Sequence, residues 1–180
     1  SFMAAFMAAG RGMKVERMDD ETVIDGKTFG KGSCVISEGE QLALDAIARE
    51  ACTEPVYAGR MGSLTAREIK IPRIALVETY FSDMDAGWTR YLFDTYHIPY
   101  TILHPDEFEG AGIEEKYDII IFPGTQKNLL ITGKPGNDGG AYMSNYHPDY
   151  QKGMGKKGLE NLLLFINNGG TVISWGQSTD

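Results

Sequence analysis

Two short runs of uninterrupted apolar residues constrain the fold of this chain more than any other feature. They are Ile74–Val77 and Ile119–Phe122, and each has the length of a single strand. Runs without alternating polar residues are typical of strands that are covered on both faces in a parallel sheet. Two further strands are expected at Tyr100–Leu103 and Thr171–Trp175. With helical segments between them, this order predicts an α/β fold built on an open, mostly parallel, doubly wound sheet.

Three helices are expected between these strands. The first begins near Asp83 and presents an aromatic face to the sheet, and the second is a short helix near Pro105–Phe108. The third is expected at Gly158–Asn168, with four apolar residues turned inward: Leu159, Leu162, Leu163 and Ile166. Residues 125–157 show little periodicity, and a loop of that size is usually functional, disordered or an interface.

The first 60 residues predict a small α+β segment. A helix is expected over residues 1–10, a strand over 13–18, a hairpin with its turn at Asp25-Gly26, and another strand over 33–36. Ser37 and Glu40 have the spacing of a capping box, which predicts a helix that begins at Ser37. Residues 57–70 are interpreted as a linker, so that the α/β domain occupies residues 70–180.

Charge and composition exclude several classes of function. The chain has 180 residues and a net charge of -8, with no cluster of Lys and Arg to neutralise a phosphate backbone, so nucleic acid is a poor candidate partner. No apolar run approaches the roughly 20 residues of a membrane-spanning helix. Cys34 and Cys52 either pair or remain separate thiols, and no spacing of His, Cys, Asp or Glu indicates a metal site. The chain starts without Met and without the pattern of a signal peptide. We therefore expect it to be a part of a longer protein.

Ligands of open parallel sheets bind at the carboxyl ends of the strands, and this rule selects the candidate site. The residues that follow the four expected strands are Glu78, Thr79 and Tyr80, then His104, then Pro123, Gly124 and Thr125, and finally Gly176, Gln177 and Ser178. His147 lies in the long loop, and it is a second candidate imidazole.

The turn Gly176-Gln177-Ser178 is where an enzyme of this architecture carries its nucleophile. The turn contains no cysteine, and the Gly-x-Ser-x-Gly spacing of serine hydrolases is absent. We therefore expect Ser178 or Thr179 to cap a following helix rather than to attack a substrate.

The segment Asp83–Arg90 has two readings. It is either a helix start, with Asp83 or Asp85 capping free amides and Trp88 packed in the core, or a binding rim formed by Trp88 and Arg90. The helix start is the favoured interpretation.

Four stretches carry a resemblance to a known family: Ile71–Leu76, Met84–Arg90, Tyr117–Pro123 and Gly169–Gly176. They resemble the amidotransferase-like region that follows the catalytic domain in large bacterial zinc carboxypeptidase-like proteins, and residues 32–36 look like the segment that precedes that region. The resemblance implies a class I glutamine amidotransferase-like sheet. It also implies an exported parent protein, periplasmic or extracellular, whose separate peptidase domain binds zinc.

This chain departs from both families in the residues that carry catalysis. It has no zinc-binding His-x-x-Glu pair, and the amidotransferase cysteine has no counterpart at Gly176-Gln177-Ser178. We therefore expect no catalytic residue and no cofactor in the chain itself, and a partner in the peptidase domain of the parent. The candidate binding residues are Glu78, Trp88, Arg90, Thr125, Gln177 and Ser178.

Two alternatives stay open. One is an independent hydrolase that uses Ser178, or a site built from Glu78, His104 and His147. The other is a small-molecule binding module that holds a sugar or a peptide end near Trp88 and Arg90.

Overall fold

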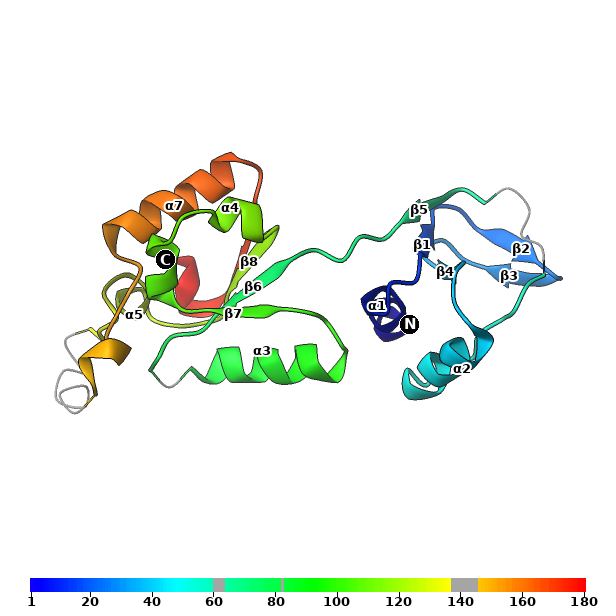
Figure 1. Ribbon diagram of the computed structural model, residues 1–180, viewed down its shortest axis with the longest axis horizontal. Helices are drawn as coiled ribbons and strands as arrows, with labels where there is room; N and C mark the ends of the chain where they lie inside the picture. The colour runs from blue at the N-terminus through cyan, green and yellow to red at the C-terminus, as the bar shows by residue number, and fades with distance from the viewer. Residues whose placement is uncertain (60–63, 82, 137–145) are drawn as a thin grey trace. The chain divides into compact units, whose positions relative to one another are not determined.

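The computed structural model describes residues 1–59, 64–81, 83–136 and 146–180, and the chain divides into two compact units (Figure 1). Unit 1 comprises Ser1–Ile71 and Tyr96–Pro99, and unit 2 comprises Pro72–Thr95 and Tyr100–Asp180. Each unit has its own cluster of buried apolar residues.

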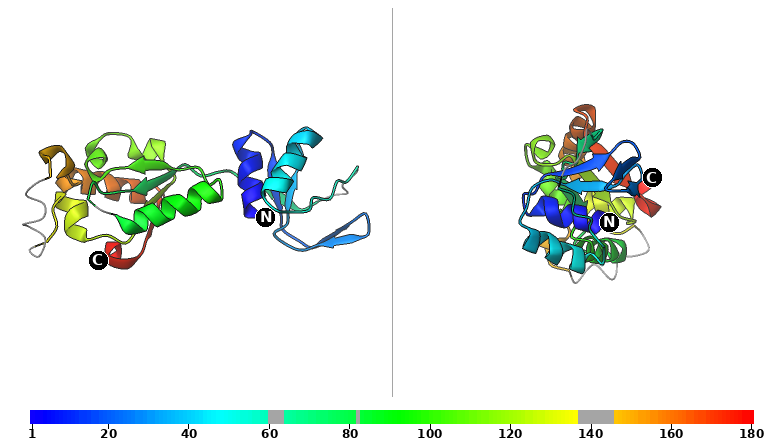
Figure 2. Two further views of the ribbon diagram at one scale, coloured as in Figure 1. Left: turned by 90° about the horizontal axis from the view of Figure 1, so that it is seen from below. Right: turned by 90° about the vertical axis from the view of Figure 1, so that its right-hand side faces the viewer.

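Unit 1 is a small α+β unit. Strands β1 (Val15–Met18), β4 (Cys34–Ile36) and β5 (Ala66–Glu68) form an antiparallel sheet in the order β4-β1-β5, and β2 (Thr22–Ile24) and β3 (Lys27–Phe29) form the predicted hairpin. Helices α1 (Phe2–Gly10) and α2 (Gln41–Glu50) lie side by side on one face of the β4-β1-β5 sheet (Figure 2). The core of the unit contains Ala5, Met7, Ala8, Val15 and Ile47.

Two predictions for unit 1 are wrong. Helix α2 begins at Gln41, with Glu40 as its N-cap residue and no side-chain cap. Ser37 lies before the helix, and its backbone amide bonds to the carbonyl of Lys14 and so continues the pairing of β4 with β1. The predicted linker contains β5, although residues 60–63 of that segment lie outside the described residues. Its sequence is charged, and the strand is held by backbone pairing with β1 and by the ion pair between Arg67 and Asp19 (2.7 Å). Cys34 and Cys52 are both free thiols.

Unit 2 is an α/β unit around a four-stranded parallel sheet, as predicted. The order is β7 (Thr101–Leu103), β6 (Ile74–Val77), β8 (Ile119–Phe122) and β9 (Thr171–Ser174). Every residue of β6 is buried, which confirms that the first apolar run is covered on both faces. Helix α3 (Met84–Thr95) lies on one side of the sheet, and α4 (Ile113–Lys116) and α7 (Gly155–Asn167) lie on the other (Figure 1).

The segments between β8 and β9 differ from the sequence prediction. The expected long loop contains α5 (Lys127–Thr132) and a 3-10 helix, η2 (Pro148–Tyr150), while residues 137–145 lie outside the described part. Helix α7 buries Gly158 and Phe165, whereas Leu159, Leu163 and Ile166, predicted to face inward, are exposed. The reason is the close approach of α7 to η1 (Pro105–Glu109), because a Cβ atom on Gly158 would lie only 2.9 Å from the Cβ of Phe108.

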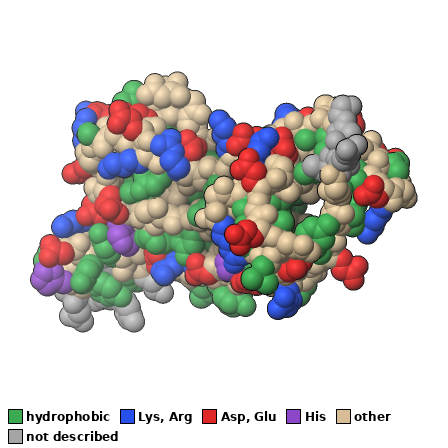
Figure 3. Space-filling model, turned by 45° about the vertical axis from the view of Figure 1, so that its right-hand side comes forward, with side chains coloured by type: hydrophobic (Ala, Val, Ile, Leu, Met, Phe, Trp, Pro, Cys, Tyr) green, Lys and Arg blue, Asp and Glu red, His purple; other side chains and the backbone are tan. Residues whose placement is uncertain are grey.

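Acidic and basic side chains are interspersed over the face shown in Figure 3, with hydrophobic patches between them. Within the described ranges, no helix is long and apolar enough to cross a membrane.

Candidate functional site

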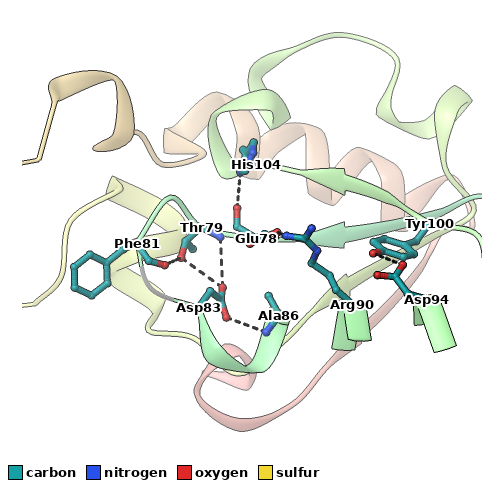
Figure 4. Close-up of polar contacts among 9 residues, drawn as sticks. All are labelled: Glu78, Thr79, Phe81, Asp83, Ala86, Arg90, Asp94, Tyr100 and His104. Carbon is teal, nitrogen blue, oxygen red and sulfur yellow. Dashed lines mark hydrogen bonds and ion pairs between the residues drawn. The ribbon is translucent and has the colours of Figure 1, made fainter. Parts of the chain in front are cut away.

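The candidate site lies at the carboxyl edge of the parallel sheet, where Glu78 follows β6 and His104 follows β7. The carbonyl oxygen of Glu78 accepts a hydrogen bond from Nδ1 of His104 (2.8 Å), and the Glu78 carboxylate forms an ion pair with Arg90 of α3 (3.0 Å; Figure 4). Two residues that the strand-end rule selects, Glu78 and His104, are therefore in contact, and Arg90 contacts Glu78.

Two contacts hold the imidazole ring of His104, and a third holds its backbone. The ring bonds to Glu78 and stacks on Tyr80 with the centroids 4.2 Å apart, and the backbone amide donates to the Glu107 carboxylate (2.6 Å). Because a carbonyl oxygen can only accept, the bond to Glu78 assigns the hydrogen to Nδ1. In the neutral ring, Nε2 therefore keeps the lone pair.

Tyr80 is held in a polar but desolvated position. Burial and a hydrogen bond with Asp106 raise the pKa of Tyr80 to about 12, so that the phenol stays neutral at physiological pH. The Oδ1 atom of Asp106 is buried, and it has no hydrogen-bond partner among the described residues. A desolvated carboxylate oxygen without a donor leaves negative potential at this edge of the sheet.

Aromatic contacts connect the loop after α5 to the same edge. The ring of Tyr150 lies 5.6 Å from Tyr80 and 6.2 Å from His147, measured between centroids. We call Tyr80, His104, His147 and Tyr150 the edge aromatic cluster. His147 reaches the site only through this cluster, because its own polar contacts are with Asp149.

Asp83 organises the loop between β6 and α3. Its Oδ1 accepts from the backbone amide of Ala86 (3.1 Å), and its Oδ2 lies 3.4 Å from both the amide and the hydroxyl of Thr79 (Figure 4). Burial raises the pKa of Asp83, although the bonds from Ala86 and Thr79 favour its charged form. The predicted capping of this helix start is confirmed, with Asp83 as the capping residue.

The prediction that Trp88 packs in the core is wrong. Its side chain is 63% exposed and makes an edge-to-face contact with Tyr91, whereas α3 buries Ala86 and Thr89. The small residues of α3 face the sheet because the hydroxyl of Thr89 bonds to the carbonyl of Asp85 (2.7 Å) and is thereby satisfied. Arg90 is two residues further, about 200° around the helix, and its contact is Glu78. The structure thus does not bring Trp88 and Arg90 together as one rim.

The turn after β9 is tied to the turn after β8. Ser178 lies in a 3-10 helix, η3 (Gly176–Thr179), and its hydroxyl donates to the carbonyl of Pro123 and accepts from the amide of Thr125 (3.0 Å). No histidine nitrogen of the described chain hydrogen-bonds to this hydroxyl. Ser178 and Thr125 are therefore together, but through a structural contact, and Gln177 is exposed on the same short helix.

Two glycines allow this close packing. A Cβ on Gly124 would lie 2.5 Å from Oδ2 of Asp85, and Gly176 has a positive φ of 60° next to the Gly124 backbone. Gly176 therefore occupies a conformation that other residues rarely adopt.

Tyr150 and Asp106 lie at this edge of the sheet but were not among the predicted site residues. Asp106 follows β7 closely enough for the strand-end rule to find it, but Tyr150 is distant from every strand in sequence, and only the docked loop reveals its place. In the described part of the chain, no group of three or more His, Cys, Asp or Glu side chains is arranged to hold a metal ion. No family model, curated protein or solved structure matches this chain.

Proposed function

We propose that this chain is a non-catalytic accessory domain of the class I glutamine amidotransferase-like type, and that it supports the peptidase domain of an exported zinc carboxypeptidase-like protein. The observation that supports the non-catalytic role most directly is the bonding of Ser178. Its hydroxyl proton is committed to the Pro123 carbonyl, and its oxygen accepts from the Thr125 amide.

Nucleophilic catalysis requires a different arrangement. A serine nucleophile needs a base within about 3.2 Å that can take its proton, and that base is normally oriented by a third group. Here the oriented base is His104, but its contacts are with Glu78, Glu107 and Tyr80 rather than with Ser178. Ser178 and His104 both lie at this edge of the sheet, but their hydrogen bonds are with other residues and not with each other.

The test is a substrate screen of the purified chain against ester, amide and peptide substrates, with labelling by a serine-directed fluorophosphonate. We expect neither turnover nor labelling. Turnover that is abolished by Ser178→Ala but kept by Thr179→Ala would overturn the proposal and favour the hydrolase alternative. Turnover lost in His104→Ala and kept in Ser178→Ala would instead favour a site built on the imidazole.

The accessory role is tested with the zinc peptidase domain of a carboxypeptidase-like protein that contains this chain. We expect deletion of residues 72–180 from that protein to raise KM for peptides while kcat changes little, because an accessory surface contributes binding rather than chemistry. Unchanged KM and kcat would contradict a supporting role.

A further inference from the structure

The rings of the edge aromatic cluster are tilted against one another and do not form a flat platform. The planes of Tyr80 and Tyr150 meet at 50°, and those of Tyr150 and His147 meet at 63° in an edge contact. Tyr80 follows β6, and His147 and Tyr150 lie at the two ends of the η2 turn, at the edge of the sheet where ligands of this architecture bind.

The side chains of Tyr150 and His147 are both exposed to solvent. Tyr150 is 52% exposed, and the side chain of His147 is 68% exposed. Tyr80 and His104 are only partly buried, and each covers one face of the other. The chain after Tyr150 is anchored to α5, because the amide of Met154 bonds to the carbonyl of Leu130 (2.8 Å). Tyr150 also contacts both Tyr80 and His147, so a ligand meets rings that already pack together.

The charges around the cluster select the class of ligand. Asp106 lies beside Tyr80 with a buried, unpartnered oxygen, and Glu107 bonds to the backbone of His104. Two basic side chains of unit 2 are already paired, Lys152 with Asp149 (3.5 Å) and Arg90 with Glu78. The carboxylates of Asp106 and Glu107 would repel an anionic ligand, whereas a cation would be attracted by them and by the negative faces of the rings.

We propose that the edge aromatic cluster binds an organic ammonium group, such as the amino end of a peptide or a quaternary ammonium, on the exposed surface of Tyr150 and His147 beside Tyr80. Rings that are tilted to one another contact a rounded cation from more than one side, whereas a sugar ring stacks on a flat aromatic face. This binding does not depend on the proposed accessory role, because it needs neither a peptidase partner nor catalysis.

The experiment uses choline as the probe and its neutral carbon isostere, dimethylbutanol, as the matched comparison, with binding to the full chain followed by NMR titration. We expect saturable binding of choline and about two- to fivefold weaker binding of the isostere, because the cation–π contact lies at a partly exposed site. N-acetylglucosamine is the sugar arm, for which no saturable binding is expected.

Variants locate the site. Tyr150→Leu is expected to weaken choline binding about two- to fivefold, while Tyr150→Phe, which keeps the aromatic face, retains it. Asp106→Asn is expected to weaken it as well, because the variant removes a carboxylate that lies beside Tyr80. Tyr91→Leu is the control, since Tyr91 is an exposed tyrosine of α3 outside the cluster. Tryptophan fluorescence checks that each variant is folded.

Four results would overturn the proposal. Equal affinity for choline and its isostere would show an apolar site, and binding of the sugar alone would show a carbohydrate site. Choline binding that survives Tyr150→Leu, or no saturable binding of any probe to the wild-type chain, would show that the cluster is not an ammonium site.

Discussion

At the residue scale, Ser178 joins two turns that are far apart in the sequence. Its hydroxyl contacts Pro123 and Thr125 after β8, while its own backbone belongs to η3 after β9. The contact holds the carboxyl ends of two neighbouring strands together beyond the last ladder pair, Phe122 with Ser174. The same hydroxyl that suggests chemistry in the sequence therefore acts as a structural link.

This link predicts a difference between two adjacent hydroxyls. Ser178→Ala leaves the partly buried amide of Thr125 without its acceptor, so we expect a loss of about 1–2 kcal/mol in the free energy of unfolding. Thr179→Ala removes only an exposed bond to the carbonyl of Gly176, and we expect less than about 0.5 kcal/mol. Urea denaturation followed by tryptophan fluorescence measures both values. Equal losses in the two variants would contradict the structural role of Ser178.

At the element scale, two helical glycines have opposite roles. Gly158 of α7 lies against η1, and a Cβ there would be 2.7 Å from the Cβ of Met154 and 2.9 Å from that of Phe108. Gly87 of α3 has open space around it. A helix gains from alanine in place of glycine only where the added methyl group has room.

We therefore expect Gly158→Ala to lower the free energy of unfolding by about 1–3 kcal/mol, because overpacking pushes α7 away from η1. The matched substitution Gly87→Ala is expected to raise it by about 0.5–1 kcal/mol. Thermal and urea unfolding of the two variants provide the comparison. A stabilising Gly158→Ala would show that α7 and η1 do not pack as closely as described.

A second element-scale prediction concerns the amino ends of β6 and β8, which Arg73 and Asp118 hold together. The side-chain and backbone hydrogen bonds of Arg73 lower the pKa of Asp118 from its ordinary value of 3.8 to about 2. A lowered carboxyl pKa in the folded state contributes stability above about pH 4, and this contribution is lost as the pH falls towards 2. Both side chains are about half exposed, so solvent screening keeps the effect small.

We expect Asp118→Asn to lower Tm at neutral pH, with a difference from the wild type that shrinks as the pH falls from about 4 to 2. The control is Asp19→Asn, since Arg67 lowers the pKa of Asp19 in the same way but within unit 1. Tryptophan fluorescence reports unit 2, which contains both Trp88 and Trp175. Asp19→Asn should therefore leave the unfolding curve detected by fluorescence unchanged. A pH-independent effect of Asp118→Asn would contradict the assignment.

The same elements show how much of the fold could be predicted. β6 and β8 could be, because strands buried on both faces have no polar alternation to obscure them. β5 could not, because it is charged and places Glu68 opposite Glu16, a pairing tolerated with Lys14 nearby. The prediction of which face of α7 points inward was wrong, because Gly158, which carries no apolar side chain, makes the contact with η1. In the site, Glu78 and His104 followed from strand ends, whereas Tyr150 depends on a loop docking that no local pattern encodes.

At the scale of the whole molecule, the two units have separate cores. The cluster of unit 2 surrounds β6 and β8 and includes Ile120, and the cluster of unit 1 lies between α1, α2 and β1 and includes Ile47. The two isoleucines are equally inaccessible, with 0% and 1% of their surface exposed. They form a matched pair for asking whether a defect in one core is felt in the other.

We expect Ile120→Ala to lower the stability of unit 2 by about 2–5 kcal/mol and to shift the tryptophan-detected urea transition accordingly, because the substitution leaves a cavity beside buried neighbours. Ile47→Ala should leave that transition within about 0.5 kcal/mol of the wild type, since the two side chains belong to separate clusters and share no partner in them. Far-UV circular dichroism, which reports both units, should show the destabilisation of unit 1 by Ile47→Ala as a loss of signal at lower urea concentration. If Ile47→Ala shifts the tryptophan transition as far as Ile120→Ala does, the chain unfolds as one cooperative body, and the two clusters are parts of a single core.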